Sequence, residues 1–175
     1  MDPVTTSGVF ALGLIFGSFL NVCIYRLPRG LSVVLPGSAC PHCGKAIRFY
    51  DNVPVLSWLI LRGRCRQCKA RITARYAIVE LLTGFLFLAC YLKFGLTLGM
   101  LKCAVLGFLL LGLIFTDAET HLLPDKMTLT GLGIGLVLSV LVPVNDLASR
   151  LLPYVVQIPV SSDVSWRLFS LLDAV

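Results

Sequence analysis

Long apolar stretches dominate the pattern of hydrophobic and polar positions along the chain. Four of them are long enough to cross a hydrocarbon core about 30 Å thick, which takes about 20 helical residues: residues 7–25, 76–94, 96–116 and 127–144. A fifth begins near Trp166 and runs to the last residue given. The pattern predicts transmembrane helices, and the second and third should form a tight hairpin because so few residues separate them.

The longest polar segment, residues 26–75, carries ten of the fifteen Lys and Arg residues and a single acid, Asp51. Basic residues beside membrane spans favour the cytoplasmic side, so we expect this loop to be cytoplasmic. No Lys or Arg precedes the first apolar stretch, so that stretch is interpreted as a retained span with its N-terminus outside, not as a cleavable signal peptide.

The composition supports a membrane protein. Hydrophobic residues make up 57% of the chain and charged residues 14%, with a mean hydropathy of +0.89, whereas about a quarter of the residues in a soluble domain are charged. The net charge of +6 is concentrated beside the spans. This distribution argues against nucleic-acid binding.

Two C-x₂-C pairs, separated by 21 residues, lie in the basic loop. This spacing is close to that of zinc ribbons, and it predicts one structural zinc ion that folds the loop, held by Cys40, Cys43, Cys65 and Cys68. The alternatives are two disulfides, which a reducing cytoplasm disfavours, and a pair of redox dithiols. His42 is a further candidate ligand. Three other cysteines lie in apolar spans and are interpreted as packing residues: Cys23, Cys90 and Cys103.

The predicted fold class is therefore an all-α polytopic membrane protein with a small cytoplasmic zinc-ribbon-like insertion. Its parts are a first transmembrane helix over 7–25, the loop over 26–75 and a helical membrane domain over 76–175. No internal repeat is visible.

Acidic residues within or beside membrane spans are functional candidates, because an ionisable group is costly at membrane depth. Asp117 ends the third span, where a carboxylate can meet a polar substrate. Asp125 stands where the N-cap of the fourth span is expected, and Glu119 is interpreted as solvated loop. Glu80 lies about one turn into the second span, either as a functional acid or as a paired interfacial one.

Several short motifs occur together and in one order. They are Gly17-Ser18-Phe19-Leu20-Asn21-Val22, Tyr25-Arg26-Leu27-Pro28, Cys40-Pro41-x-Cys43, Asp51-Asn52-Val53-Pro54, Cys65-x-x-Cys68, Arg75-Tyr76-x-x-Val79-Glu80-Leu81-Leu82-Thr83-Gly84 and Asp117-x₅-Leu123-Pro124-Asp125. In this combination the chain resembles bacterial prepilin peptidases from residue 13 to about residue 143.

The resemblance implies a multi-pass enzyme of the bacterial inner membrane with a periplasmic N-terminus. It implies an aspartic endopeptidase that cleaves the leader of type IV prepilins or pseudopilins. It further implies N-methylation of the new N-terminus with S-adenosylmethionine as methyl donor. Asp117 matches the family's first catalytic aspartate. The second belongs to a Gly-x-Gly-Asp motif that residues 1–175 do not contain, so we expect an N-terminal portion that is inactive alone.

Two other functions stay open at this point. One is a non-catalytic membrane zinc-ribbon adaptor that binds pilin precursors. The other is a thiol-based membrane oxidoreductase, which only the cysteine pairs support.

Overall fold

The computed structural model describes residues 2–40, 42–121 and 125–142. The long helices are α1 (Pro3–Arg26), α3 (Arg75–Phe94), α4 (Leu98–Thr120) and α5 (Asp125–Leu141), and the short ones are η1 (Leu27–Arg29), η2 (Phe49–Asp51) and α2 (Leu56–Ile60). In these described ranges the chain forms no β-strand, only the isolated bridges Ala39–Ala46 and Arg64–Arg71. The predicted all-α class is confirmed.

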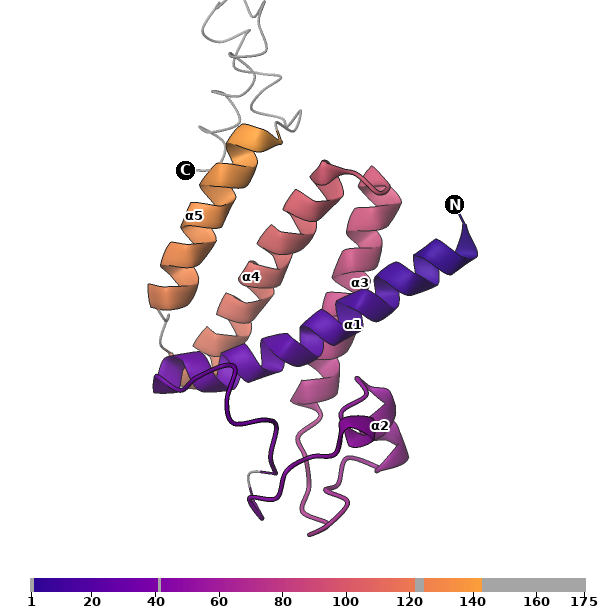
Figure 1. Cartoon of the computed structure of the whole chain (residues 1–175), viewed down its shortest axis with the longest axis vertical. Coiled ribbons are helices and arrows are strands. Elements are labelled where there is room, and N and C mark those ends of the chain that lie inside the picture. Colours follow the sequence, from indigo (N-terminus) through magenta and orange to yellow (C-terminus); the bar gives the residue numbers. More distant parts are fainter. Residues whose placement is uncertain (1, 41, 122–124, 143–175) are drawn as a thin grey trace, which may run out of the picture.

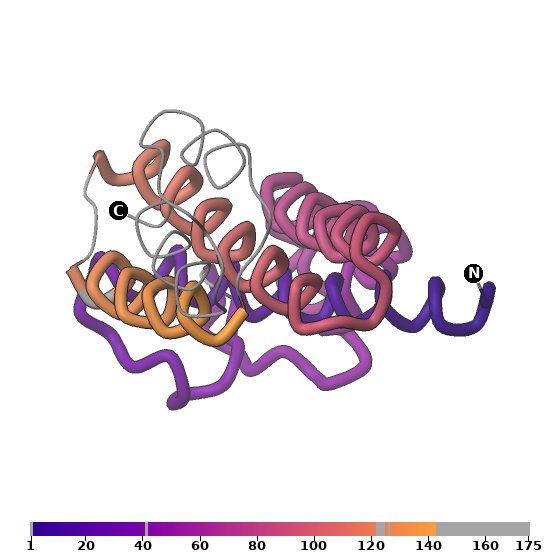
Figure 2. The backbone as a smooth tube through the Cα atoms, turned by 90° about the horizontal axis from the view of Figure 1, so that it is seen from above, coloured from indigo at the N-terminus to yellow at the C-terminus, as the bar shows by residue number. Residues whose placement is uncertain are grey.

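The helices α3, α4 and α5 lie in a row, and α1 crosses them obliquely (Figures 1 and 2). Helix α1 packs chiefly on α3 and also touches α4, while α5 packs on α4. The segment between η1 and α3, which holds α2, lies beyond the lower end of α3 in Figure 1. Residues near Trp166, where a fifth span was predicted, lie outside the described residues.

Three helical stretches are long and apolar enough to cross a membrane: Pro3–Arg29, Arg75–Phe94 and Leu98–Thr120, with mean hydropathies of 2.0, 1.8 and 2.3. Apolar side chains on their outer faces are exposed, for example Ile15 at 58% and Ile114 at 61%. Exposed apolar faces of this extent suit contact with lipid. Helix α5 is shorter, with 17 residues, and the predicted span 127–144 extends beyond the described range.

Glycines allow α1 and α3 to approach closely. A Cβ atom added at Gly17 would lie 2.7 Å from the Cα of Glu80, and one at Gly13 would lie 2.8 Å from the Cα of Gly84. Small residues four positions apart on a helix face let two backbones pack closely in a membrane, where no hydrophobic effect drives helices together. The contact fixes the position of Glu80 against α1.

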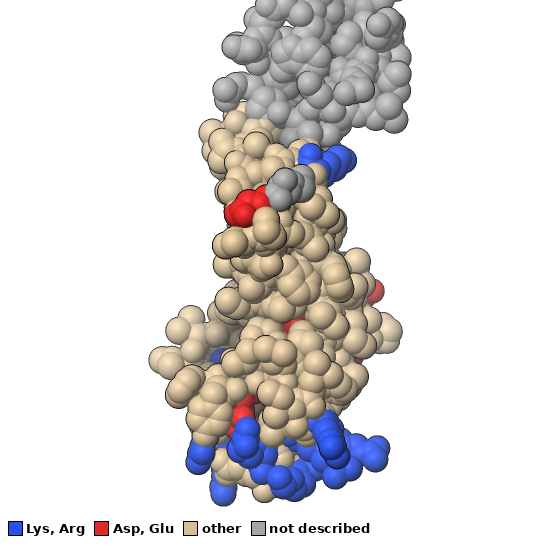
Figure 3. Space-filling model, turned by 90° about the vertical axis from the view of Figure 1, so that its right-hand side faces the viewer, with Lys and Arg blue, Asp and Glu red and all other residues tan. Residues whose placement is uncertain are grey.

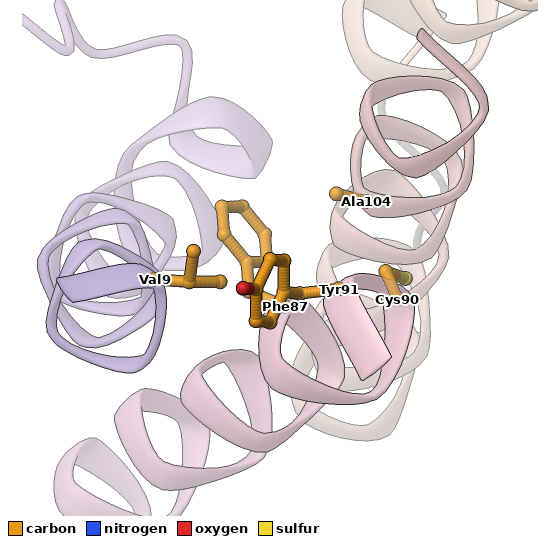
Figure 4. Close-up of a cluster of buried hydrophobic side chains, with 5 residues drawn as sticks. All are labelled: Val9, Phe87, Cys90, Tyr91 and Ala104. Atoms are coloured by element: carbon orange, nitrogen blue, oxygen red, sulfur yellow. The ribbon is translucent and has the colours of Figure 1, made fainter. Parts of the chain in front are cut away.

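Helices α3 and α4 form the tight hairpin that the sequence predicts. Gly95 adopts a φ of +63°, and Thr97 caps α4 by accepting a hydrogen bond from the Met100 N–H at 3.3 Å. Beside this turn α1, α3 and α4 share a buried cluster of Val9, Phe87, Cys90, Tyr91 and Ala104 (Figure 4). A second cluster joins α1, α3 and α5 through Leu20, Ile24, Val79 and Met127.

Helix α5 is held against α4 at both ends of their contact. At one end the Met127 side chain occupies the space that a side chain at Gly112 would fill. At the other end the buried Lys102 donates from Nζ to the carbonyl oxygen of Val142 at 3.2 Å, just past the end of α5. A cation at a helix C-terminus also complements the helix dipole.

Basic side chains gather at the end of the molecule that carries the loop (Figure 3). Most of the surface above them is uncharged in this view. An apolar helical body with basic residues at one end is the distribution found in membrane proteins.

Candidate metal centre and candidate active-site residues

The four cysteines of the two C-x₂-C pairs come together at one place in the loop. All four Sγ atoms of Cys40, Cys43, Cys65 and Cys68 lie within 4.8 Å of one another. The Sγ atoms of Cys40 and Cys68 are 3.8 Å apart. Tetrahedral zinc with Zn–S bonds of about 2.3 Å requires S–S distances of about 3.8 Å, so this donor set is compatible with a zinc ion.

Each pair forms the same backbone turn. The Gly44 N–H donates to the Cys40 oxygen at 2.9 Å, and the Lys69 N–H donates to the Cys65 oxygen at 3.0 Å. Gly44 and Lys69 both have positive φ, at 68° and 58°. Each turn places the two thiols of its pair on the same side of the backbone.

The similarity of the two turns extends along ten residues. The hydrogen bonds from Cys40 N–H to Lys45 oxygen and from Ile47 N–H to Ser38 oxygen recur 25 positions later, in the same register. At their described positions the segments 38–47 and 63–72 therefore form a structural repeat, which was not visible in the sequence. The signal in the sequence is the shared pattern C-x₂-C-x₃-Ile, which is short and weak.

Side chains outside the cysteines connect the two halves of the loop. The indole N–H of Trp58 donates to the Ile72 oxygen at 3.2 Å, and Gly63 packs against the Trp58 ring. The Nε–H of Arg66 donates to both carboxylate oxygens of Asp51, each at a distance of 2.9 Å. The guanidinium of Arg66 holds the pKa of Asp51 below its usual value.

The thiols of the second pair differ in acidity in the metal-free protein. The backbone N–H groups of Cys68 and Gln67 stabilise the Cys65 thiolate and lower its pKa to about 6. The Ala70 N–H lowers the pKa of Cys68, but desolvation and hydrogen bonds to the other three thiols outweigh it and raise that pKa to about 11. Because a metal ion binds the thiolate form of cysteine, binding at Cys65 and Cys68 should release protons.

The remaining cysteines pack, as the sequence predicts. Cys23 and Cys90 are buried, and Cys103 lies against the cluster that contains Cys90. His42 belongs to the first cysteine turn and lies outside the group of four thiols that could hold a metal ion.

Asp117 lies in the last turn of α4 and its side chain is exposed. Its backbone oxygen accepts the His121 N–H at 2.8 Å, which ends the helix with His121 in the left-handed conformation. This turn also carries Glu119 and no basic residue. Glu119 was expected to be solvated loop. It is exposed but lies in α4, and its carboxylate pairs with Arg75 at the start of α3. Asp125 is exposed in the first turn of α5, where its charge complements the helix dipole.

Glu80 is buried, with 8% of its surface exposed, and it faces α1 and the loop. Its Oε2 accepts the Val55 N–H at 2.7 Å, and the Ser18 hydroxyl forms a second hydrogen bond with the carboxylate. Val55 has a φ of +61°, which is rare for a β-branched residue. Glu80 thus holds a strained residue of the loop at the start of α2.

A cavity of about 640 Å³ opens between the end of α1, the loop and the start of α3. Glu80 and Asn21 lie in its wall. The amide nitrogen of Asn21 donates to the Tyr76 oxygen at 2.9 Å, while its buried Oδ1 has no partner among the described residues. Sequence reasoning missed Asn21, although a lone amide in an apolar span is a signal.

Comparisons with known proteins agree on one family. Residues 11–94 match the model of the bacterial peptidase A24 N-terminal domain. The chain is 47% identical over 137 residues to a protein of Myxococcus xanthus named prepilin leader peptidase/N-methyltransferase, covering 78% of this chain and 41% of that protein.

Two more proteins of the same name are similar. That of Aeromonas hydrophila is 40% identical over 157 residues, covering 76% of this chain and 54% of the relative. That of Neisseria gonorrhoeae is 36% identical over 161 residues, covering 78% of this chain and 56% of the relative. The chain thus spans about half the length of the curated relatives it matches. No solved structure matches it.

Proposed function

Because the chain belongs to the bacterial prepilin peptidase family through its peptidase A24 N-terminal domain, we propose that it acts in the maturation of type IV prepilins or pseudopilins. The reactions are cleavage of the leader peptide and N-methylation of the new N-terminus. The observation that carries the proposal is the 47% identity over 78% of this chain to a relative with that name.

The proposed catalytic group of this chain is the Asp117 carboxylate. In an aspartic peptidase two carboxylates share a proton: one takes a proton from the attacking water, and the other donates a proton to the scissile amide. An exposed carboxylate at the end of an apolar helix can reach a peptide that emerges from the membrane. Asp117 meets this requirement in α4.

The second carboxylate is expected from a Gly-x-Gly-Asp motif, which residues 1–175 do not contain. We therefore propose that these residues do not hydrolyse a peptide by themselves. One carboxylate cannot be the base and the acid of the same step. This also keeps the adaptor function as the alternative, in which the zinc-binding loop binds pilin precursors without cleaving them.

The proposed cofactor of the loop is a structural zinc ion held by Cys40, Cys43, Cys65 and Cys68. The mutual distances of the thiols support it. With four protein ligands no coordination position stays open for a substrate, so the role of the metal is to fold the loop.

The proposed location is the bacterial inner membrane, with the loop in the cytoplasm and the N-terminus in the periplasm. Ten basic residues between Arg26 and Arg75 support this orientation. A membrane-impermeant maleimide, added to intact cells, should label a cysteine introduced at Val4 but not one introduced at Lys45. Labelling at Lys45 from outside contradicts the orientation.

For methylation the proposed donor is S-adenosylmethionine. It supplies a methyl group that passes to the amine nitrogen of the new N-terminus, with loss of one proton, and leaves a neutral thioether.

The proposed function is tested by a prepilin-processing assay in cells that lack their own prepilin peptidase. The complete reading frame that encodes these residues should restore leader cleavage, and residues 1–175 alone should not. Restored cleavage by residues 1–175 contradicts the two-carboxylate mechanism. Binding of prepilin by the complete protein without any cleavage favours the adaptor.

A further inference from the structure

The carboxylate of Glu80 is buried without a counter-ion. In the described part of the chain its partners are the Val55 N–H and the Ser18 hydroxyl, and neither ion pair found there includes Glu80. A buried carboxylate is costly unless a positive charge compensates it. A buried carboxyl group avoids this cost by staying protonated, whereas a cation bound beside it stabilises the ionised form. The position therefore suits a cation, and the described residues do not provide one.

The cavity beside Glu80 has room for that cation. Its volume of about 640 Å³ lies within the range of about 300–1,000 Å³ that small-molecule sites occupy. Trp58 lines the same cavity, and its hydrogen bond to Ile72 fixes the indole ring. Aromatic rings attract organic cations through their negative faces. In the described residues no Lys or Arg lies over the Trp58 ring.

The loop side of the cavity has the opposite charge. Lys45, Arg48, Arg64 and Arg71 line it. They would repel a simple cation but would attract a carboxylate. Two further basic residues of the lining already have partners within the protein. Arg26 donates hydrogen bonds to three loop carbonyls, and Arg66 forms an ion pair with Asp51. The cavity therefore suits a compound with a positive group at one end and a negative group at another.

We propose that this cavity binds an organic cation whose positive group lies against the Glu80 carboxylate. The proposal rests on the proposed function for the identity of the cation. It is either the sulfonium of the methyl donor or the ammonium of the new N-terminus. Lys45 and its basic neighbours favour the donor, which also carries a carboxylate.

The matched variants are Glu80→Gln and Glu119→Gln. In Glu80→Gln a side-chain oxygen can still accept the Val55 N–H, so the loop contact is kept while the charge is lost. Glu119→Gln makes the same chemical change outside the lining of the cavity. Both proteins are first compared with the unaltered chain for zinc content and thermal stability.

Binding is followed by isothermal titration on the purified 175-residue chain in nanodiscs. The ligands are S-adenosylmethionine, its neutral-sulfur analogue S-adenosylhomocysteine, a short peptide with a free N-terminus, and the same peptide acetylated at its N-terminus. The cationic member of one pair should bind at least about tenfold more tightly than its neutral partner, because a charge-assisted contact is worth about 1.5–3 kcal/mol. Glu80→Gln should remove this preference and Glu119→Gln should keep it.

The pair that shows the preference identifies the cation. The proposal is overturned if neither pair shows it, or if Glu80→Gln leaves it unchanged. The proposed function fails separately: a chain that binds the cation through Glu80, in a complete protein that neither cleaves nor methylates prepilin, contradicts that function and leaves the site standing.

Discussion

At the scale of single residues, Asp117 lies at a position where its charge does not stabilise the helix that carries it. A negative charge in the last turn opposes the helix dipole, and the last turn of α4 has no basic residue. Glu119, two positions on, is compensated by Arg75 from α3. A local arrangement that costs stability is expected at functional sites. This supports Asp117 as the reactive carboxylate and Glu119 as a structural one.

The first prediction is that Asp117→Asn abolishes leader cleavage by the complete protein. Asn keeps the volume and removes the group that exchanges a proton, a contribution of roughly 10²–10⁴-fold in rate. Zinc content and the amount of protein in the membrane should not change. The measurement is prepilin processing in cells. Asp125→Asn serves as the control and should retain cleavage, since Asn fits the start of a helix nearly as well as Asp.

Lys69 is the non-glycine counterpart of Gly44 in the two cysteine turns. Its φ of 58° costs an ordinary residue about 1–2 kcal/mol relative to glycine. The second prediction is that Lys69→Gly stabilises the loop by about 0.5–1 kcal/mol. This net value is smaller than the relieved strain because glycine also increases the conformational entropy of the unfolded chain. The same substitution should lower the dissociation constant for zinc severalfold. Competition with a chromophoric chelator measures this constant. Lys69→Ala separates the loss of charge from the backbone effect and should bring no gain.

At the scale of elements, the crossing of α1 and α3 depends on glycine. The third prediction is that Gly17→Ala destabilises the helical part by about 1–3 kcal/mol, the usual cost of overpacking, because the new Cβ would lie 2.7 Å from the Cα of Glu80. Thermal unfolding in detergent, followed by circular dichroism, measures it. Gly8→Ala lies in the same helix with nothing within 4 Å of the added atom, and it should cause no loss.

The helices could be predicted from the sequence because long apolar stretches have few other stable states in a membrane. The hairpin between α3 and α4 followed from the few residues that join them. The meeting of the four thiols followed from the spacing of their pairs. These features depend on local sequence, so local reasoning was sufficient for them.

What could not be predicted depends on contacts between distant segments. The contact of Glu80 with Val55 spans 25 positions, and that of Asn21 with Tyr76 spans 55. Neither has a local signature. The pairing of Glu119 with Arg75 was not predicted for the same reason, because Arg75 lies on another helix. The repeat of the cysteine turns was missed since backbone hydrogen bonds, more than side chains, define it.

At the scale of the whole molecule, the loop has little apolar interior of its own. Among its described residues the buried hydrophobic side chains are Cys40 and Cys65. The helices, in contrast, bury two apolar clusters that contain no residue between 30 and 74. The two parts of the protein should therefore depend differently on the metal.

The last prediction is that removing zinc unfolds the loop and leaves the helices folded. Zinc binding contributes roughly 10–16 kcal/mol to the folding of small zinc-dependent domains, and the described residues of the loop form no buried apolar cluster that could replace it. After chelation, trypsin should cut rapidly within residues 26–75, which hold ten of the fifteen Lys and Arg residues. The helical signal in far-ultraviolet circular dichroism should change little.

Cys68→Ser should reproduce this protease sensitivity without a chelator, because three thiols hold zinc far more weakly than four. Cys103→Ser changes a cysteine that packs between helices, and it should keep both the metal and the resistance to trypsin. Unfolding of the loop also opens the wall of the cavity beside Glu80, so chelation should abolish the binding of organic cations. A loop that still resists trypsin after all zinc has been removed would contradict the structural role of the metal.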